Sequence, residues 1–366
     1  MTFAVVTGGG TSGHYLPAMA IAEALVAGGH PADDIHYVGT QRGIEARLAP
    51  ISGHPYTLLD VVGLQRSLST KNLALPATLR RSVKEAVALL QQLQPKVVVN
   101  VGGYGSFPAT WAARKLGIPY VVVSYDKRPG LVSKLLAPKA AAVAAAFEGS
   151  PLPGARLTGA PLRQAILQVD RAAQRDAARV ALDLPSDRFV VAVMTGSLGA
   201  GVVNAAVAAL VEQWADRTDL AVHHVVGDRF LDQAAPARDG AAGILYRVIG
   251  YEDRMPEVYA AADLLVTRAG SSTIAELACT GTPGIVIPWP DAAENHQLGN
   301  AQVLSDVGAA VLLEQRDLTV ERLGAEIDGL RANPARLAAI AERAAEAGQT
   351  HRSGALAALV EEVAAR

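Results

Sequence analysis

The chain has 366 residues, half of them apolar and 19% charged, a balance that excludes an intrinsically disordered protein. Its length exceeds what one hydrophobic core usually serves, so two domains of ordinary size are expected. The formal net charge of −2 provides no global field to attract nucleic acid, and no nucleic-acid partner is expected.

The number of cysteines and the sequence at the amino terminus indicate the cellular compartment. The single cysteine, Cys279, cannot form an internal disulfide, and the chain enters an apolar strand without the basic start of a secretory signal. The longest apolar stretches, such as residues 140–147, are far shorter than the roughly 20 residues that span a bilayer. These features predict a cytoplasmic protein that meets a membrane, if at all, from its surface.

Short apolar runs that end in glycine loops alternate with stretches of helical period, the first of them predicted over residues 17–27. This alternation is typical of βαβ units, whose right-handed crossovers produce a parallel sheet covered by helices. The main runs predicted as strands are residues 3–6, 35–38, 97–101, 120–123, 189–194, 222–226 and 264–266.

A polar, proline-containing stretch at residues 148–161 separates two series of strands. We therefore predict an N-terminal acceptor-binding and membrane-facing domain over residues 1–160 and a C-terminal donor-binding domain over residues 161–340. Residues 341–366 are predicted to end in a helix that packs back on the first domain. The predicted fold class is α/β, with two Rossmann-like, doubly wound parallel-sheet domains that face a central cleft.

The first glycine loop, residues 8–13, has the G-x-G-x-x-G spacing that lets backbone amides approach a pyrophosphate. In a dinucleotide site an acidic residue follows about 20 positions later, but Asp33 and Asp34 precede the next strand, which disfavours a dehydrogenase. A tight turn without a ligand is the alternative. His14 follows the loop, where an imidazole that titrates near neutrality could accept a hydroxyl proton, although a lone histidine is more often structural.

Two further loops follow predicted strands. Residues 102–106 precede a helix that begins near Pro108, and we expect them to contact an acceptor. Residues 196–199 offer backbone amides and a hydroxyl at a helix amino terminus, where partial positive charge stabilises a departing diphosphate. An ordinary turn between strand and helix explains this last loop equally well.

Within residues 268–276, Thr273 and Glu276 have the spacing of a helix capping box, which alone would explain both. The alternative is functional: the amides of residues 271–273 bind phosphate and the Glu276 carboxylate binds ribose hydroxyls. The polar run at residues 291–300 could contact sugar hydroxyls, or it could be a solvated loop before the next helix.

Residues 66–84 combine lysines and arginines with leucines, a composition typical of a helix on an anionic membrane surface, although an ordinary surface helix fits equally. The sequence contains no D-x-D triplet and no His/Cys cluster with metal-ligand spacing. Catalysis without a metal ion or another cofactor is therefore predicted.

Taken together, these motifs resemble those of the MurG-type glycosyltransferases, which have the GT-B fold and use UDP-N-acetylglucosamine to make lipid II on the inner face of the bacterial membrane. The resemblance runs almost from end to end. It rests on GGGTSGH at residues 8–14, GGYGSFPA at 102–109, GAPLR at 159–163, GSLGA at 196–200, RAGSSTIAEL at 268–277 and HQLGNA at 296–301.

The resemblance implies a role for each matching residue. His14 would be the general base or a close acceptor contact, with Thr11 and Tyr104 beside it. The UDP-sugar, a co-substrate, would be bound by residues of several motifs. These are Arg163 and Ser197 for the diphosphate, Tyr251 and the backbone of Glu252 for uracil, Ser271, Ser272 and Thr273 for phosphate, Glu276 for ribose, and His296 and Gln297 for the donor sugar.

Two positions depart from the family pattern. One is His296, which stands beside Gln297 where the family often has a glutamine or glutamate, so N-acetylglucosamine is only the default donor sugar. Where the family usually has His-Glu-x-Asn after a strand, this chain has Val123-Ser124-Tyr125-Asp126. Ser124 and Asp126 are thus the acceptor-side candidates, and the departure favours a paralogue with an altered acceptor site, in cell-envelope or lipid-linked, phosphoglycolipid-type antibiotic assembly. The alternatives are lipid II formation from lipid I, a UDP-sugar epimerase, and a non-catalytic UDP-sugar-binding protein.

The predicted reaction is a single inverting displacement without a metal ion. His14 takes the acceptor proton, the acceptor hydroxyl attacks the anomeric carbon, and UDP departs. The expected partners are a UDP-sugar, with N-acetylglucosamine as the default, a polyprenyl-linked or other lipid-linked acceptor, and an anionic membrane surface. The expected location is the inner face of the plasma membrane.

Overall fold

The computed structural model describes residues 2–10, 12–61, 75–196, 199–292 and 295–366. It divides the chain into two compact units. The N-terminal unit comprises residues 1–164 and 350–366, and the C-terminal unit comprises residues 165–349. Each unit contains its own seven-stranded sheet.

The sheet of the N-terminal unit is entirely parallel, in the order β3-β2-β1-β4-β5-β6-β7. Because the order reverses between β1 and β4, the loops that follow these two strands lie next to each other, which is where ligands bind in doubly wound sheets. The strands are β1 (Ala4–Thr7), β2 (Ile35–Thr40), β3 (Tyr56–Leu59), β4 (Val97–Asn100), β5 (Tyr120–Ser124), β6 (Ala142–Ala145) and β7 (Ala155–Leu157).

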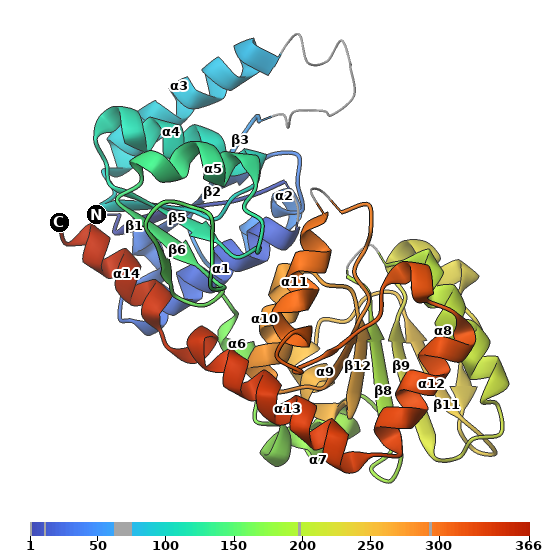
Figure 1. The fold of residues 1–366 in the computed structure, drawn as a ribbon. Helices are drawn as coiled ribbons and strands as arrows, with labels where there is room; N and C mark the ends of the chain where they lie inside the picture. The colour runs from blue at the N-terminus through green and yellow to red at the C-terminus, as the bar shows by residue number, and fades with distance from the viewer. Residues whose placement is uncertain (1, 11, 62–74, 197–198, 293–294) are drawn as a thin grey trace. The chain divides into compact units, whose positions relative to one another are not determined.

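Helices cover both faces of this sheet (Figure 1). On one face, α1 and α14 pack together, and α14 also contacts β4, β5 and β6, so the end of the chain belongs to this unit. On the other face, α3 packs against α4, which lies on β4 and β5. The helices are α1 (Ser12–Ala27), α2 (Glu45–Leu48), α3 (Leu75–Leu93), α4 (Phe107–Leu116), α5 (Leu131–Leu136) and α14 (Ala355–Ala364).

The sheet of the C-terminal unit has the order β10-β11-β9-β8-β12-β13-β14 and is parallel except for the β10–β11 pair. Its order reverses between β8 and β12, which brings the loops after those strands together. The strands are β8 (Phe189–Met194), β9 (Leu220–Val225), β10 (Arg238–Asp239), β11 (Leu245–Ile249), β12 (Leu264–Thr267), β13 (Gly284–Val286) and β14 (Val311–Leu312).

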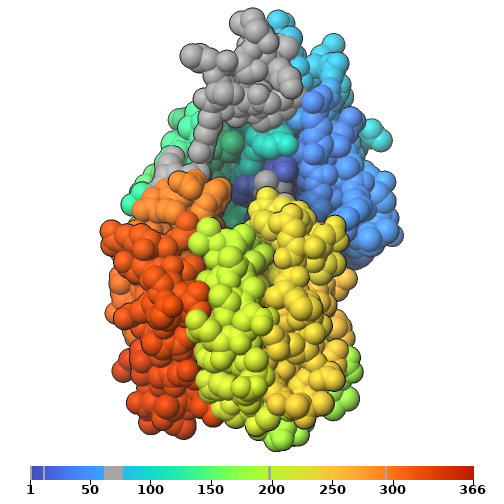
Figure 2. Space-filling model, turned by 90° about the vertical axis from the view of Figure 1, so that its right-hand side faces the viewer, coloured from blue at the N-terminus to red at the C-terminus, as the bar shows by residue number. Residues whose placement is uncertain are grey.

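Two helices of the C-terminal unit, α8 and α12, lie side by side on one face (Figure 2). They approach closely at Gly324, where a Cβ would lie 2.9 Å from Leu210 Cδ2. Their buried side chains join the valines of β8 and β9 in one core. The helices of this unit are α7 (Arg171–Ala181), α8 (Gly201–Gln213), α9 (Met255–Ala261), α10 (Ser271–Thr280), α11 (His296–Ser305), α12 (Val320–Arg331) and α13 (Pro334–Gly348), with α6 (Gln164–Leu167) at the boundary.

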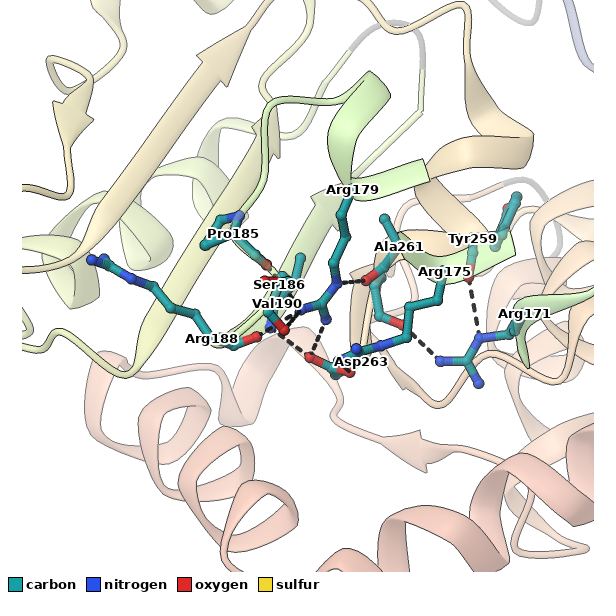
Figure 3. A network of polar contacts seen from close by, with 11 residues as sticks. Arg171, Arg175, Arg179, Pro185, Ser186, Arg188, Val190, Tyr259, Ala261 and Asp263 are labelled. Carbon is teal, nitrogen blue, oxygen red and sulfur yellow. Dashed lines mark hydrogen bonds and ion pairs between the residues drawn. The ribbon is translucent and has the colours of Figure 1, made fainter. Parts of the chain in front are cut away.

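A buried arginine attaches α7 to the rest of the C-terminal unit (Figure 3). The Arg179 side chain is 1% exposed, and its Nη2 lies 2.7 Å from Asp263 Oδ2. Asp263 also pairs with Arg175 at 2.9 Å. Burial lowers the pKa of Arg179, and Asp263 opposes this shift. The other four hydrogen bonds of the Arg179 guanidinium go to the carbonyls of Ala261, Pro185, Ser186 and Arg188.

The prediction of an α/β fold with two Rossmann-like parallel-sheet domains is confirmed. Each predicted strand is present, with its ends within two residues of the expected positions. The predicted start of the first helix at residue 17 is wrong, because α1 begins at Ser12 and includes Pro17. His14 therefore lies in the first turn of α1.

Candidate active site

The first glycine loop leads from β1 into α1. Gly10 has φ +100°, and a Cβ there would lie 2.3 Å from Cε1 of Tyr104, so the ring of Tyr104 packs directly on this loop. The side chain of His14 is partly exposed. Thr11, which the resemblance assigns to the acceptor, lies outside the described residues.

The second glycine loop follows β4 and is fixed by a buried amide. The side-chain oxygen of Asn100 accepts the N–H of Gly102 at 2.8 Å, and its amino group donates to Ser106 Oγ and Thr110 Oγ1. Gly103 has φ +75°, and a Cβ there would lie 2.6 Å from Cδ2 of His14. The structure therefore brings the second loop against the imidazole and Tyr104 against the first loop.

Tyr125 contacts His14 and was missed as a site residue by the sequence analysis. It follows β5, is 4% exposed, and its hydroxyl is hydrogen-bonded to Nδ1 of His14. The same hydroxyl donates to the carbonyl oxygen of Gly13 at 2.6 Å. Burial raises the pKa of Tyr125 well above its usual value, and the charge of Asp126 raises it further. The only sequence signal was the departure from the family motif at residues 123–126.

The two acceptor candidates next to Tyr125 differ in exposure. Ser124 is 5% exposed at the end of β5, whereas Asp126 is partly exposed. Asp126 is therefore the more accessible of the two residues, and Ser124 is largely covered.

A second residue missed from the sequence is Glu45, whose carboxylate is fully buried under the first loop. Its Oε1 accepts the N–H of Gly10 at 2.7 Å and the N–H of Thr40 at 3.2 Å. Among the described residues, Oε2 has no hydrogen-bond partner. Burial and then the charge of Glu45 raise the pKa of Tyr104. Glu45 thus fixes the backbone of the loop that precedes α1 and His14.

In the C-terminal unit, the loop after β8 leads into α8. Gly199 donates its N–H to the carbonyl of Gly196 at 2.9 Å, and a Cβ at Gly199 would lie 2.0 Å from the carbonyl oxygen of Val226. The residue that precedes α8, Ala200, has no side chain that could cap the helix. Ser197, the predicted diphosphate contact in this loop, lies outside the described residues.

Helix α10 begins at Ser271, directly after Gly270. The capping-box explanation of Thr273 and Glu276 is therefore wrong, because Thr273 lies inside the helix and Glu276 Oε2 accepts a hydrogen bond from the hydroxyl of Tyr259 at 2.7 Å. The N–H groups of residues 271–273 belong to the first turn, which lacks intrahelical acceptors. A helix amino terminus of this kind is suited to an anion.

The loop between β12 and α10 is braced by Arg268. Its guanidinium is buried and donates to the carbonyl of Ile287 at 3.1 Å and to Oε1 of Gln315 at 2.7 Å. Burial lowers the pKa of this guanidinium. Arg268 therefore ties the loop at the amino end of α10 to the end of β13.

Gln297 connects the same two loops. Its Oε1 accepts the N–H of Trp289 at 2.9 Å and the N–H of Ala269 at 3.3 Å. His296 and Gln297 are the first two residues of α11, so the alternative of a solvated loop through residue 300 is wrong. The structure places the side chain of Gln297 against the loop that precedes Ser271. Both residues therefore lie where parallel strands of the C-terminal sheet end.

The predicted uracil contacts follow β11. Tyr251 is 48% exposed, whereas Glu252 is 7% exposed. The Glu252 carboxylate accepts both the backbone N–H and the Nε of Arg254 at 3.0 Å, and it lies 3.3 Å from Nε2 of His223. Although burial raises the pKa of Glu252, the bonds with His223 and Arg254 outweigh it and lower the pKa to about 2. The Glu252 carboxylate is thus bound by side chains and backbone of the protein itself.

Arg163 lies in the N-terminal unit, directly before α6, and is partly exposed. The other donor residues within the described chain lie in the C-terminal unit. Where the structure describes the chain, no cluster of three or more His, Cys, Asp or Glu side chains could hold a metal ion. In the same part of the chain, no helix is both long enough and apolar enough to cross a membrane.

Two doubly wound sheets with glycine loops at their switch points are typical of the GT-B fold, the fold class of this chain. The crystal structure of Acinetobacter baumannii MurG superposes with a TM-score of 0.77 at 26% identity and covers all of both chains. The glycosyltransferase SnogD from Streptomyces nogalater, at 18% identity and a TM-score of 0.64 over the full length of both chains, shares the fold.

The sequence comparisons narrow this class to a family. The N-terminal and C-terminal domain models of glycosyltransferase family 28 match residues 4–145 and 190–356. Two curated relatives are similar to this chain over 99% of its length and 98% of their own, at 38% identity for the protein of Acidothermus cellulolyticus and 35% for that of Desulforudis audaxviator. Both are named UDP-N-acetylglucosamine--N-acetylmuramyl-(pentapeptide) pyrophosphoryl-undecaprenol N-acetylglucosamine transferase. The chain belongs to this family, the MurG-type glycosyltransferases, and is a glycosyltransferase.

Proposed function

We propose that the protein transfers a sugar, by default N-acetylglucosamine, from a UDP donor to a hydroxyl of a lipid-linked acceptor, with inversion at the anomeric carbon. The observation that carries this proposal is the position of His14, a partly exposed imidazole in the first turn of α1 between the backbone of Gly103 and the hydroxyl of Tyr125. Membership of the family supports the choice of donor, since the relatives named above are UDP-N-acetylglucosamine transferases.

In the proposed step, His14 accepts the proton of the acceptor hydroxyl while that oxygen bonds to the anomeric carbon. The bond from this carbon to the diphosphate breaks, and UDP leaves. The N–H groups at the start of α10, together with Arg163 and Ser197, stabilise the charge that develops on the diphosphate. No metal ion takes part in this step.

The remaining donor residues have distinct tasks in this proposal. Tyr251 packs on uracil, and the backbone of Glu252 hydrogen-bonds it, which agrees with the inward-facing carboxylate of Glu252. Glu276 binds the ribose hydroxyls with a carboxylate that Tyr259 orients. His296 and Gln297 contact the donor sugar from the first turn of α11.

We propose an acceptor site that differs from that of the family. Tyr125 lies in the altered motif, and its hydroxyl is hydrogen-bonded to Gly13 and His14. In this proposal Asp126 replaces a contact of the missing motif, and Thr11, Tyr104 and Ser124 are the other acceptor contacts. Such a change suits a paralogue in cell-envelope or lipid-linked antibiotic assembly. Lipid I remains the second candidate acceptor, because the family relatives act on a pyrophosphoryl-undecaprenol substrate.

The proposal includes a peripheral position on the inner face of the plasma membrane. Helix α3 carries Arg80, Arg81 and Lys84 on a leucine-containing helix, and Arg81 is 60% exposed although it pairs with Asp60. Basic side chains on such a helix are attracted to anionic lipid headgroups.

The test is an assay of the full chain with UDP-N-acetylglucosamine and a panel of acceptors that includes a lipid I analogue and other polyprenyl-diphosphate glycolipids, read by mass spectrometry. A glycosylated lipid supports the proposal, and its identity decides between the two acceptor candidates. Interconversion of the UDP-sugar without any lipid indicates an epimerase, and UDP-sugar binding without turnover indicates a binding protein. Either of these outcomes overturns the proposal.

A further inference from the structure

We infer that the hydroxyl of Tyr125 holds His14 in the tautomer with its proton on Nδ1, which makes Nε2 the atom that accepts the acceptor's proton. The second half of this inference rests on the function proposed above. The first half is a statement about the free protein alone. Tyr125 is in this view a positioning residue, which acts on the acceptor only through His14.

The first step of the argument concerns the backbone of α1. In an α-helix each N–H donates to the carbonyl four residues earlier. Pro17 has no N–H, so the carbonyl of Gly13 loses its helical donor. The hydroxyl of Tyr125 donates to this carbonyl instead, at 2.6 Å. The proline inside α1 thus creates the acceptor that fixes the direction of the Tyr125 O–H bond.

The second step counts protons. A tyrosine hydroxyl has one proton to donate and lone pairs that accept. Because this proton lies between the hydroxyl and the Gly13 oxygen, the contact with His14 needs a proton from the ring nitrogen. Nδ1 must therefore carry the proton. If Nδ1 had a lone pair, either this contact or the 2.6 Å contact with Gly13 would join two acceptors without a proton between them.

The third step is burial. Tyr125 is 4% exposed, which leaves little room for water to replace either hydrogen bond. The pKa of Tyr125 is raised well above its usual value by burial, so the hydroxyl keeps its proton at any pH at which the protein works. In neutral imidazole one nitrogen donates and the other accepts. With the proton on Nδ1, the lone pair lies on Nε2.

The chain offers a matched control at the start of β5, the strand that Tyr125 follows. Tyr120, the first residue of β5, is 2% exposed and donates its hydroxyl to the carbonyl of Leu136 at 2.9 Å. Tyr120→Phe and Tyr125→Phe each remove one buried hydroxyl that bonds a backbone carbonyl. Tyr125→Phe also removes the hydroxyl that contacts Nδ1 of His14.

The experiment is NMR of the full chain with ¹⁵N-labelled histidine at about pH 8, where an imidazole is neutral. His14→Gln identifies the His14 signals among the eight histidines. We expect the Nδ1–H pattern for His14 in the wild type and in Tyr120→Phe, and its loss or mixture with the Nε2–H pattern in Tyr125→Phe. An Nε2–H pattern in the wild type overturns the inference, and this spectrum decides it even if Tyr125→Phe does not fold.

Kinetics test the second half of the inference, in which Nε2 of His14 accepts the proton of the acceptor. By analogy with other groups that orient a functional imidazole, kcat of Tyr125→Phe should fall about 10- to 100-fold with KM for the UDP-sugar little changed. Tyr120→Phe should keep its kcat. Equal kcat values in the two variants overturn the positioning role. Because the tautomer is read without substrate, failure of the proposed transfer reaction would leave the NMR result standing, so the two failures are distinguishable.

Discussion

Replacing Arg179 with methionine should destabilise the C-terminal unit severely. The substitution keeps an unbranched apolar stem in a site that is 1% exposed, but it removes the guanidinium. Five hydrogen bonds are lost, four of them to backbone carbonyls and one to the carboxylate of Asp263. The Asp263 carboxylate keeps its bonds to Arg175 and to the N–H of Val190.

The expected loss of stability follows from the carboxylate and the carbonyls that the substitution leaves buried without their donor. Removing one partner of a buried charge pair typically costs about 3–5 kcal/mol, because the remaining charge and carbonyls stay buried without their donor. Carbonyls that lose their donor and stay dry would add to this loss, by about 1–3 kcal/mol each. We therefore expect the free energy of unfolding of the C-terminal unit to fall by at least about 3–5 kcal/mol.

The assay is urea unfolding followed by tryptophan fluorescence. Trp214 and Trp289 lie in the C-terminal unit, and a Trp111→Phe background removes the signal of the N-terminal unit. The matched control is Arg175→Met on the same helix, because Arg175 is 39% exposed and pairs with the same carboxylate. This exposed pair should contribute about 0–1 kcal/mol. Equal losses in the two variants, or a loss below about 1 kcal/mol for Arg179→Met, would refute the reasoning.

Three further predictions concern the site. His14→Ala should lower turnover by about 10²–10⁴ while UDP still raises the unfolding temperature, and undiminished turnover would rule out His14 as the base. Gly103→Ala should lower both turnover and stability because its Cβ meets His14, whereas Gly117→Ala, at φ +73° with open space around it, should show only the backbone strain of about 1–2 kcal/mol. The Glu252 pKa is lowered from 4.5 to about 2, so the stability it contributes is present above about pH 4.5 and is lost as the pH falls toward about 2. The difference in unfolding free energy between wild type and Glu252→Gln should therefore shrink from about pH 5 to about pH 3, and a constant difference would contradict the shift.

Local sequence patterns were sufficient to predict features that depend on a single segment of the chain. Valine-rich runs such as β4 are buried on both faces, and this burial requires a continuous apolar sequence that is visible without the fold. The glycine loops were predicted for a similar reason, since Gly10 and Gly103 have positive φ and cannot carry a Cβ at their contacts.

Local patterns misled where two structures share one spacing. Thr273 and Glu276 are three residues apart both in a capping box and within a helix, so the sequence could not tell whether the helix begins before or at Thr273. Pro17 similarly suggested a helix start, but α1 extends five residues further toward the amino terminus. In both cases the start of the helix was decided by the loop that precedes it and by its tertiary contacts.

The sequence by itself determined the α/β class, the strand positions and the glycine loops, because these depend on residues that are close along the chain. Only the tertiary structure showed that Tyr125 contacts His14 across 111 residues and that Glu45 holds Gly10 across 35. The reason is the order of the sheet, in which β1 lies between β2 and β4 and β5 follows β4. Parallel crossovers bring the ends of these strands to one edge, and no local periodicity records which side chains meet there.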